Sequence, residues 1–305
     1  MILVTGATGF LGKAVCKKLI EKNIEFSKTS LSLGCDLRNK EQVENLFSKA
    51  KPDFVLNCAA HVGSLHYVTT YAADVFYDNT QMALNIYNVA AKVGPDARII
   101  NPLANCSYPG DSDIQREIDW WVNEVHESVF SYGNAKRFIY VISKCYNKQN
   151  GLKSINFLIP NTFGPGDSTD PNKTHALNGI IIRMIKAERN GDAEFEVWGT
   201  GSPVREWAYI DDVVNIIIEG IYTKEDLIYP VNLAQNKGYS VKESAEMIAD
   251  SVGFKGKLTF NADYQDGDPI KILDDKKFRQ LFPEFQFFNH KKGIEETVKY
   301  YKSVL

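Results

Sequence analysis

The sequence predicts an α/β protein in which a doubly wound parallel sheet is followed by a smaller α+β part. Short apolar runs alternate with helical stretches over the first 160 residues, and a glycine-rich turn follows the first run. A Gly/Pro-rich loop at 164–171 ends this alternation. Strands that are separated by helices of ten or more residues pair in parallel through right-handed crossovers. We therefore expect two parts, 1–163 and 164–305, with 207–235 packing back onto the first.

The elements of the first part follow from their hydrophobic periodicity. Its strands are expected at 2–5, 24–29, 54–58, 97–102 and 155–159. Its helices are expected at 10–22, 40–50, 72–92 and 116–150, the last of them interrupted near 132–133. In the second part we expect helices at 176–189, 211–222 and 240–252, with short strands at 194–197 and 207–210. Ser240 and Glu243 have the spacing of a capping box.

The composition excludes several classes of function. The net charge is −3 and no long run of one sign occurs, so we expect no nucleic-acid partner. No apolar stretch approaches the roughly 20 residues that a bilayer requires, so we expect no membrane segment. The five cysteines are an odd number without a C-x-x-C pair. They favour reduced thiols in the cytoplasm, and no metal site is expected.

A glycine-rich turn is the first functional motif. Gly6, Gly9 and Gly12 lie between the first strand and the first helix. In such a turn the first glycine permits the bend, the second lets the backbone approach a pyrophosphate, and the third lets helix and strand pack closely. The N-terminus of the helix adds free N–H groups and a positive dipole end. The motif predicts a Rossmann-type dinucleotide site.

The residues about twenty positions further on discriminate between cofactors. A carboxylate there would hold the ribose 2′-hydroxyl of NAD, but this stretch contains Lys28, Thr29 and Ser30. A lysine beside two hydroxyls favours the 2′-phosphate of NADP, although Lys28 is equally compatible with a solvated surface position. We expect NADP, with NAD as the alternative. Asp36 and Leu37 are positioned to bracket the adenine, and Asp36 could instead cap the next helix.

Tyr132 and Lys136 form the second motif. Residues four apart lie on one face of a helix, and an ammonium beside a phenol favours the phenolate, which lowers the pKa of the tyrosine. Such a tyrosine can exchange a proton with a sugar hydroxyl or carbonyl near neutral pH. We therefore expect this pair to be catalytic.

With these two motifs the whole chain resembles the extended short-chain dehydrogenase/reductases, which include nucleotide-sugar epimerases, dehydratases and reductases. Within that family it is most similar to the GDP-L-fucose synthases, the 3,5-epimerase/4-reductases of GDP-4-keto-6-deoxymannose. Four stretches carry the closer likeness: 60–63, 105–109, 170–175 and 197–206. The resemblance implies that Tyr132 and Lys136 serve the reduction, that Cys106 is the base at C3 and C5, and that His175 returns the proton.

The resemblance also implies the remaining contacts and a homodimer. The nucleotide-diphosphate sugar would meet Val62, Asn105, Asn161, Arg183, Trp198, Arg205 and Asp266. The cofactor would meet the turn and several strand ends: Gly6, Thr8, Gly9, Phe10, Leu11, Gly12, Lys28, Asp36, Leu37, Ala59, Ala60, His61, Asn79, Leu103, Lys136, Pro160, Asn161 and Phe163.

One position departs from the family pattern. The family places Ser or Thr four residues before the tyrosine of the strand-end motif, and counting back from Tyr108 gives Ala104. An alanine cannot donate a hydrogen bond to the 4-keto oxygen, and losing one such donor costs about a hundredfold in rate. Ser107 is displaced and should point elsewhere, so Asn105 or a water would have to substitute.

The sequence thus indicates an enzyme of deoxysugar or polysaccharide biosynthesis. We expect epimerisation of an NDP-linked, most simply GDP-linked, 4-keto sugar, with or without reduction at C4. Two alternatives stay open: a redox-neutral epimerase that holds its cofactor tightly, and a catalytically weak nucleotide-binding or regulatory homologue.

Overall fold

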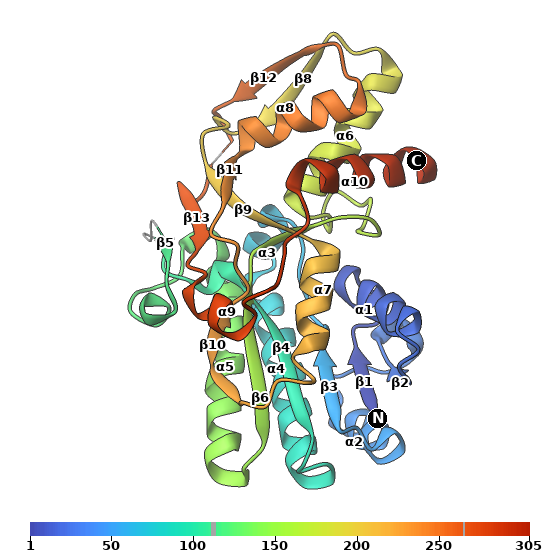
Figure 1. Ribbon diagram of the computed structural model, residues 1–305, viewed down its shortest axis with the longest axis vertical. Helices are drawn as coiled ribbons and strands as arrows, with labels where there is room; N and C mark the ends of the chain where they lie inside the picture. The colour runs from blue at the N-terminus through green and yellow to red at the C-terminus, as the bar shows by residue number, and fades with distance from the viewer. Residues whose placement is uncertain (111–113, 265) are drawn as a thin grey trace.

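The computed structural model describes residues 1–110, 114–264 and 266–305. Its centre is a six-stranded sheet of the order β10-β6-β4-β3-β1-β2, and every pairing in it is parallel (Figure 1). The chain begins in the interior at β1, adds β2 on one side and then builds outward on the other. This confirms the predicted doubly wound α/β fold. The strands are β1 (Ile2–Thr5), β2 (Phe26–Lys28), β3 (Phe54–Asn57), β4 (Arg98–Ala104), β6 (Lys153–Ile159) and β10 (Leu227–Asn232).

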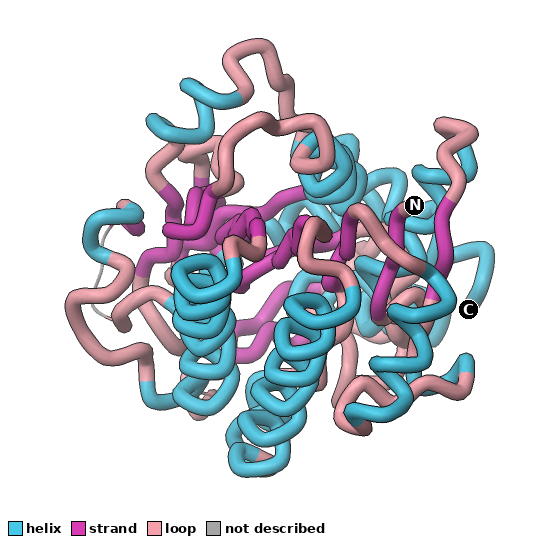
Figure 2. The backbone as a smooth tube through the Cα atoms, turned by 90° about the horizontal axis from the view of Figure 1, so that it is seen from below, coloured by secondary structure: helices cyan, strands magenta, loops and turns pink. Residues whose placement is uncertain are grey.

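Helices cover both faces of this sheet (Figure 2). They are α1 (Phe10–Glu21), α2 (Lys40–Ala50), α3 (Leu65–Thr70), α4 (Ala72–Val93), α5 (Phe130–Asn150) and α7 (Ile210–Glu219). Because side chains alternate along a strand, Leu3 packs with α2, α4 and α5, whereas its neighbour Val4 packs with α1 and α7. Apolar residues on both faces explain why these strands are uninterrupted apolar runs in the sequence.

The second part contains two smaller sheets, with β8 and β12 at the top of Figure 1. One of these sheets includes β5 (Ile114–Gln115) and β7 (Asn161–Phe163), which precede residue 164. The strands of the second part itself are β8 (Glu194–Trp198), β9 (Val204–Tyr209), β11 (Gly238–Ser240), β12 (Lys257–Asn261) and β13 (Ile270–Leu273). Its helices are α6 (Ala176–Asn190), α8 (Val241–Val252), α9 (Lys276–Leu281) and α10 (His290–Val304). The capping box of Ser240 and Glu243 at the start of α8 is confirmed. Among the described helices, none is long and apolar enough to cross a membrane.

A buried carboxyl joins the strands of this second part. Glu206 on β9 is fully buried, and its two oxygens accept the backbone N–H groups of Gln235 and Leu273 at 2.8 Å each. Burial raises the pKa of Glu206 to about 8, in spite of these hydrogen bonds. The carboxyl therefore connects β9 both to β13 and to the turn after β10.

Residues 207–235 return from the second part to the first. Within this segment α7 packs against α1, and β10 hydrogen-bonds to β6 as the outermost strand of the large sheet. The division into 1–163 with 207–235 and 164–305 stays a prediction, which these contacts support.

The helix predicted across 116–150 is wrong in its first part. Residues Glu117–Asp119 and Glu127–Val129 form short 3-10 turns, and α5 runs without interruption from Phe130. Two carbonyls of this loop, those of Trp120 and Asn123, are satisfied by a side chain instead of a helical ladder. Arg137 on α5 donates to the backbone oxygens of Ser107, Trp120 and Asn123 at 2.7–2.8 Å.

Candidate active site

The predicted loops leave the large sheet at a single edge. The carboxyl ends of the parallel strands meet there, because Thr5 pairs with Asn57 and Ala104 pairs with Ile159. The Thr5 hydroxyl donates to the Asn57 side-chain oxygen at 3.0 Å and accepts the Ala59 N–H at 3.2 Å. In open α/β sheets a ligand binds outside this edge, where the strand order reverses.

The glycine turn has the close contacts that a phosphate cradle needs. Gly6 has φ +61°, and a Cβ at this position would lie 2.7 Å from the backbone of Ala59. A Cβ at Gly12 would lie 2.1 Å from the Gly6 carbonyl oxygen, so only glycine fits there. Gly9 is the N-cap of α1 and no side chain caps this helix. The first N–H groups of α1 are therefore available to an anion.

Hydroxyl groups gather beside the turn. The hydroxyl oxygen of Ser32 lies 2.8 Å from that of Thr8 and 3.1 Å from that of Ser30. Lys28 is exposed at the end of β2. Burial raises the pKa of the Cys16 thiol, and the charge of Lys28 offsets part of that rise. The predicted role of Lys28 toward a 2′-phosphate stays a prediction. Ser32 was missed because no motif marks it.

Asp36 belongs to a chain of charges. Arg38 donates to Asp36 at 2.8 Å and to Asp78 on α4 at 3.0 Å, and the Arg38 guanidinium holds the pKa of Asp36 below its usual value. Leu37 is buried beside them. Asp78 continues the chain to His61, whose Nδ1 lies 2.8 Å from the Asp78 carboxylate.

Asn79 on α4 clamps the loop after β3. Its side-chain oxygen accepts the His61 N–H at 3.0 Å, and its amide donates to the His61 carbonyl at 2.7 Å. This contact fixes the backbone of Ala60 and Val62, the neighbours of His61. Leu103 and Phe163 are fully buried, and their contact with a cofactor stays a prediction.

Tyr132, Lys136 and Cys106 come together at the start of α5. The Lys136 ammonium lies 5.3 Å from the centre of the Tyr132 ring and donates to the Pro102 carbonyl at 3.2 Å. Gly133 makes the contact with Cys106 possible, since a Cβ there would lie 2.7 Å from the Cys106 carbonyl oxygen. The predicted pair therefore lies beside the predicted base.

Burial dominates the protonation of these three groups. It raises the pKa of Tyr132, and the nearby Cys106 raises it further. It also raises the pKa of Cys106 and lowers that of Lys136 to about 8. We expected the Lys136 ammonium to lower the pKa of Tyr132, but in the structure burial raises this pKa instead.

His175 belongs to a second group, which lies against the glycine turn. Its ring centre is 5.3 Å from that of Phe10, and its Nδ1 is 3.0 Å from the Asp167 carboxylate. Burial alone would raise the pKa of Asp167, but hydrogen bonds with His175 and Asn178 hold it below its usual value. Asp167 thus orients the imidazole and leaves Nε2 for a ligand.

The end of β4 has the predicted departure at Ala104 and, next to it, the amide of Asn105. Ser107 does point elsewhere: its hydroxyl donates to the Ala104 carbonyl at 2.6 Å and accepts the Trp120 indole N–H at 2.9 Å. Asn105 is only 4% exposed, and its side-chain N–H₂ has no hydrogen-bond partner within the described ranges. A buried donor without a partner costs about 1–3 kcal/mol, so Asn105 is a candidate for a ligand contact.

The predicted substrate residues of the second part form a connected group. Arg183 lies 4.4 Å from the centre of the Trp198 ring, whose other contact is a stack on Tyr264 at 4.9 Å. Asp266 accepts the Thr200 N–H at 2.8 Å, and Arg205 donates to the Asp266 carbonyl at 3.1 Å. Arg183, Trp198, Arg205 and Asp266 are thus brought together.

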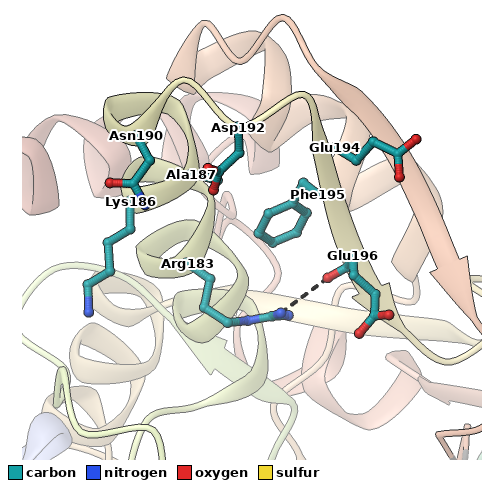
Figure 3. Close-up of a pocket in the computed structure, with 8 residues that line it drawn as sticks. All are labelled: Arg183, Lys186, Ala187, Asn190, Asp192, Glu194, Phe195 and Glu196. Carbon is teal, nitrogen blue, oxygen red and sulfur yellow. Dashed lines mark hydrogen bonds between the residues drawn. The ribbon is translucent and has the colours of Figure 1, made fainter.

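Arg183 also forms one wall of an open cavity between α6 and β8 (Figure 3). Its guanidinium donates to the Glu196 carbonyl at 3.1 Å, as the dashed line in Figure 3 marks. The other lining residues are Lys186, Ala187, Asn190, Asp192, Glu194 and Phe195. None of the predicted catalytic side chains lines this cavity, so it lies apart from the Tyr132 group.

Comparison with known proteins decides the family. Residues 2–227 match the model of the NAD dependent epimerase/dehydratase family. The chain belongs to this family. It is 29% identical to a probable GDP-L-fucose synthase from Oryza sativa, over 98% of this chain and 91% of that protein. It is 27% identical to a GDP-L-colitose synthase from Yersinia pseudotuberculosis, over 98% and 97%. A GDP-L-fucose synthetase from Naegleria fowleri, solved with bound NADP, is 28% identical with a TM-score of 0.87, over 99% and 94%.

Several residues of this epimerase/dehydratase family member were missed by sequence reasoning. Asp167 orients His175, and Tyr264 and Thr200 support Trp198 and Asp266. Thr200 had a sequence signal, because it lies in the stretch 197–206 that carries the family resemblance, and Asp167 directly follows the glycines of the loop Gly164-Pro165-Gly166. Tyr264 has no such signal, since its contact with Trp198 joins residues 66 positions apart.

Proposed function

We propose that the protein is a nucleotide-sugar epimerase/reductase that uses NADPH on a GDP-4-keto-6-deoxy sugar. The observation that carries this proposal is the meeting of Cys106 with the Tyr132–Lys136 pair at the end of β4. Relatives named GDP-L-fucose synthase and GDP-L-colitose synthase, which match over nearly the whole chain, support the GDP-linked substrate.

The turn fits a dinucleotide. The close approaches at Gly6 and Gly12 and the uncapped start of α1 provide room and N–H donors for a pyrophosphate. The hydroxyls of Thr8, Ser30 and Ser32 are donors without an opposing carboxylate among their hydrogen-bond partners, which suits a 2′-phosphate. NADPH, when bound, supplies the hydride for C4.

The chain's own residues would carry the protons. Cys106, once deprotonated, takes the proton from a carbon next to the ketone, and the electron pair of that C–H bond moves onto the keto oxygen as an enolate. His175 then returns a proton to the carbon through Nε2, because its Nδ1 is held by Asp167. Tyr132 gives its proton to the C4 oxygen during reduction, and burial, which keeps the phenol protonated, suits that role.

Asn105 would replace the missing hydroxyl at the ketone. Ala104 has no donor and the Ser107 hydroxyl is already engaged, whereas the Asn105 amide is buried without a partner in the described structure. We propose that this amide donates to the 4-keto oxygen beside Tyr132.

The decisive experiment is incubation with NADPH and GDP-4-keto-6-deoxymannose in deuterated water. Deuterium at C3 or C5 is expected from epimerisation, and loss of NADPH absorbance is expected from reduction. Exchange without NADPH consumption would indicate an epimerase that does not reduce the ketone, whereas a redox-neutral epimerase returns its own hydride to the sugar and would take up no deuterium at that carbon. Neither signal over a panel of NDP-4-keto sugars would contradict the enzyme proposal and favour a nucleotide-binding homologue.

We propose in addition a cytoplasmic homodimer that serves deoxysugar and polysaccharide biosynthesis. The five cysteines are free, and α4 exposes Phe76, Tyr77 and Leu84, which are 41–62% exposed. Large apolar side chains on an exposed helix are typical of an interface. Sedimentation should give about twice the chain mass of 34.4 kDa, and a monomer at micromolar concentration would contradict the dimer.

A further inference from the structure

Three ionisable side chains outside the predicted site meet next to Cys106. Asp268 is 5% exposed, and one of its oxygens lies 2.8 Å from the Lys271 ammonium. Its other oxygen lies 3.5 Å from Nε2 of His126 and has no hydrogen-bond partner by geometry among the described residues. His126 Nδ1 accepts the Ser128 N–H at 3.3 Å, which turns Nε2 toward Asp268. We call Asp268, Lys271 and His126 the charge cluster.

The backbone fixes the charge cluster against the turn that carries Cys106. Pro109 bridges to Val125, the residue before His126, and a Cβ at Gly110 would lie 2.9 Å from the His126 Cβ. A Cβ at Gly133 would touch both the Cys106 carbonyl at 2.7 Å and the Val125 side chain at 3.2 Å. Cys106 and the segment of His126 are therefore neighbours on the same side of α5.

The surrounding charges act on the thiol in opposite directions. Burial raises the pKa of Cys106, and Asp268 adds to the rise. The Lys271 ammonium acts in the lowering direction more strongly than the second ammonium, that of Lys136 on α5. Tyr132 is the other titratable group facing Cys106 from α5, and Arg205 is a further cation near Asp268.

We propose that Lys271, held in place by Asp268 and His126, is a positioning residue that stabilises the thiolate of Cys106. A buried thiol without such a cation would stay protonated and could not act as a base. The ammonium offsets the negative charge on sulfur before proton abstraction. The paired carboxylate keeps Lys271 ordered while limiting how far its charge lowers the pKa. This inference rests on the proposed role of Cys106 as base.

The pH dependence of Cys106 alkylation tests the inference without any sugar. The full-length protein is treated with iodoacetamide between pH 6 and 11, and the Cys106 peptide is quantified by mass spectrometry. Lys271→Met should move the midpoint upward by about one pH unit, because an opposite charge nearby favours the ionised form. Asp268→Asn should move it downward, since the opposing charge is gone and the shape is kept.

Opposite shifts from two members of one cluster are a result that a merely structural role would not give. Lys271→Arg should keep the midpoint near that of the wild type, and Lys276→Met, an exposed lysine nearby in the sequence, is the matched control. Unchanged midpoints in Lys271→Met and Asp268→Asn, or shifts in the same direction, would overturn the inference. If Lys271→Met does not fold, the direction of the Asp268→Asn shift decides.

The outcome is separable from that of the proposed function. Shifted midpoints without deuterium exchange into any sugar would contradict the epimerase and leave the electrostatic coupling in place. Exchange with unshifted midpoints would retain the epimerase and remove Lys271 from the activation of its base.

Discussion

Cys106 is the residue that we propose as the base of epimerisation. Cys106→Ser should lower deuterium exchange at C3 and C5 by about a hundredfold or more, because a serine hydroxyl does not ionise in the range where a thiol does. The affinity for NADPH should not change, since Cys106 is not among the residues of the turn. Exchange followed by NMR checks the first point, and fluorescence titration the second. Cys145→Ser is the control, because this cysteine is exposed on α5. Undiminished exchange would remove Cys106 from the mechanism.

Asn105 is the residue that we propose as the hydrogen-bond donor to the ketone during reduction. Asn105→Leu keeps the side-chain shape and removes the amide, so NADPH oxidation should slow by about ten- to a hundredfold. Thermal stability should hold or rise, because a buried donor without a partner is removed. Adding Ala104→Ser to this variant should restore part of the rate. A variant that reduces the ketone at the wild-type rate would contradict the proposed role.

For single residues, the sequence predicted which side chains lie close together better than it predicted their pKa values and hydrogen bonds. The spacing of Tyr132 and Lys136 predicted their nearness correctly, yet burial rather than the ammonium controls the pKa of Tyr132. The displacement of Ser107 could be deduced by counting residues. Its hydrogen bond with the Trp120 indole could not, because that bond depends on how the loop after β4 folds back.

The position of the predicted catalytic pair on helix α5 depends on Gly133, which lets the start of this helix approach Cys106 closely. Gly133→Ala would place a Cβ 2.7 Å from the Cys106 carbonyl oxygen and should push the first turn of α5 away. A displacement of about 1 Å can cost a hundredfold in rate, so kcat should fall by about that factor with little change in NADPH affinity. Gly94→Ala, whose Cβ would have no neighbour nearer than 3.8 Å, is the control. Equal kcat values for the two variants would show that the contact is unimportant.

Among the elements, five of the six strands of the large sheet were predicted from periodicity, whereas its outermost strand β10 was not. Helix α2 agrees with its predicted bounds, and most others agree within a few residues. The failure at 116–129 has a definite cause. The Arg137 guanidinium donates to the carbonyls of Trp120 and Asn123 in this segment and to that of Ser107 before it, so two carbonyls of the segment accept a distant side chain in place of a helical N–H. A side chain from a distant element can replace local structure in a way that no local pattern indicates.

The stability of the whole molecule should depend on pH through Glu206. In the unfolded chain a glutamate ionises near pH 4.3, whereas burial raises the pKa of Glu206 in the fold to about 8. The folded state therefore binds more protons between these values, and its stability falls as pH rises from about 5 to 8. One such group contributes a slope of at most about 1.4 kcal/mol per pH unit.

Calorimetry on the wild type and Glu206→Gln checks this prediction. The variant should have a lower Tm at pH 5.5, because its amide cannot accept both backbone N–H groups. The gap should narrow toward pH 8, since the variant lacks the titrating group. Parallel Tm curves across this range would show that Glu206 does not titrate there.

Trp198 contacts both Arg183 and Tyr264, and these contacts have a consequence for the fluorescence of the protein. Of the four tryptophans, Trp120 and Trp207 are buried, whereas Trp121 and Trp198 are each about half exposed, and only Trp198 belongs to the group proposed to hold the nucleotide. A guanidinium and a phenol ring in contact with an indole alter its emission. Any ligand that draws Arg183 away from the ring or covers Trp198 will change the fluorescence. The fluorescence of Trp198 can therefore be used to rank nucleotide sugars by their binding affinity before any turnover is detected.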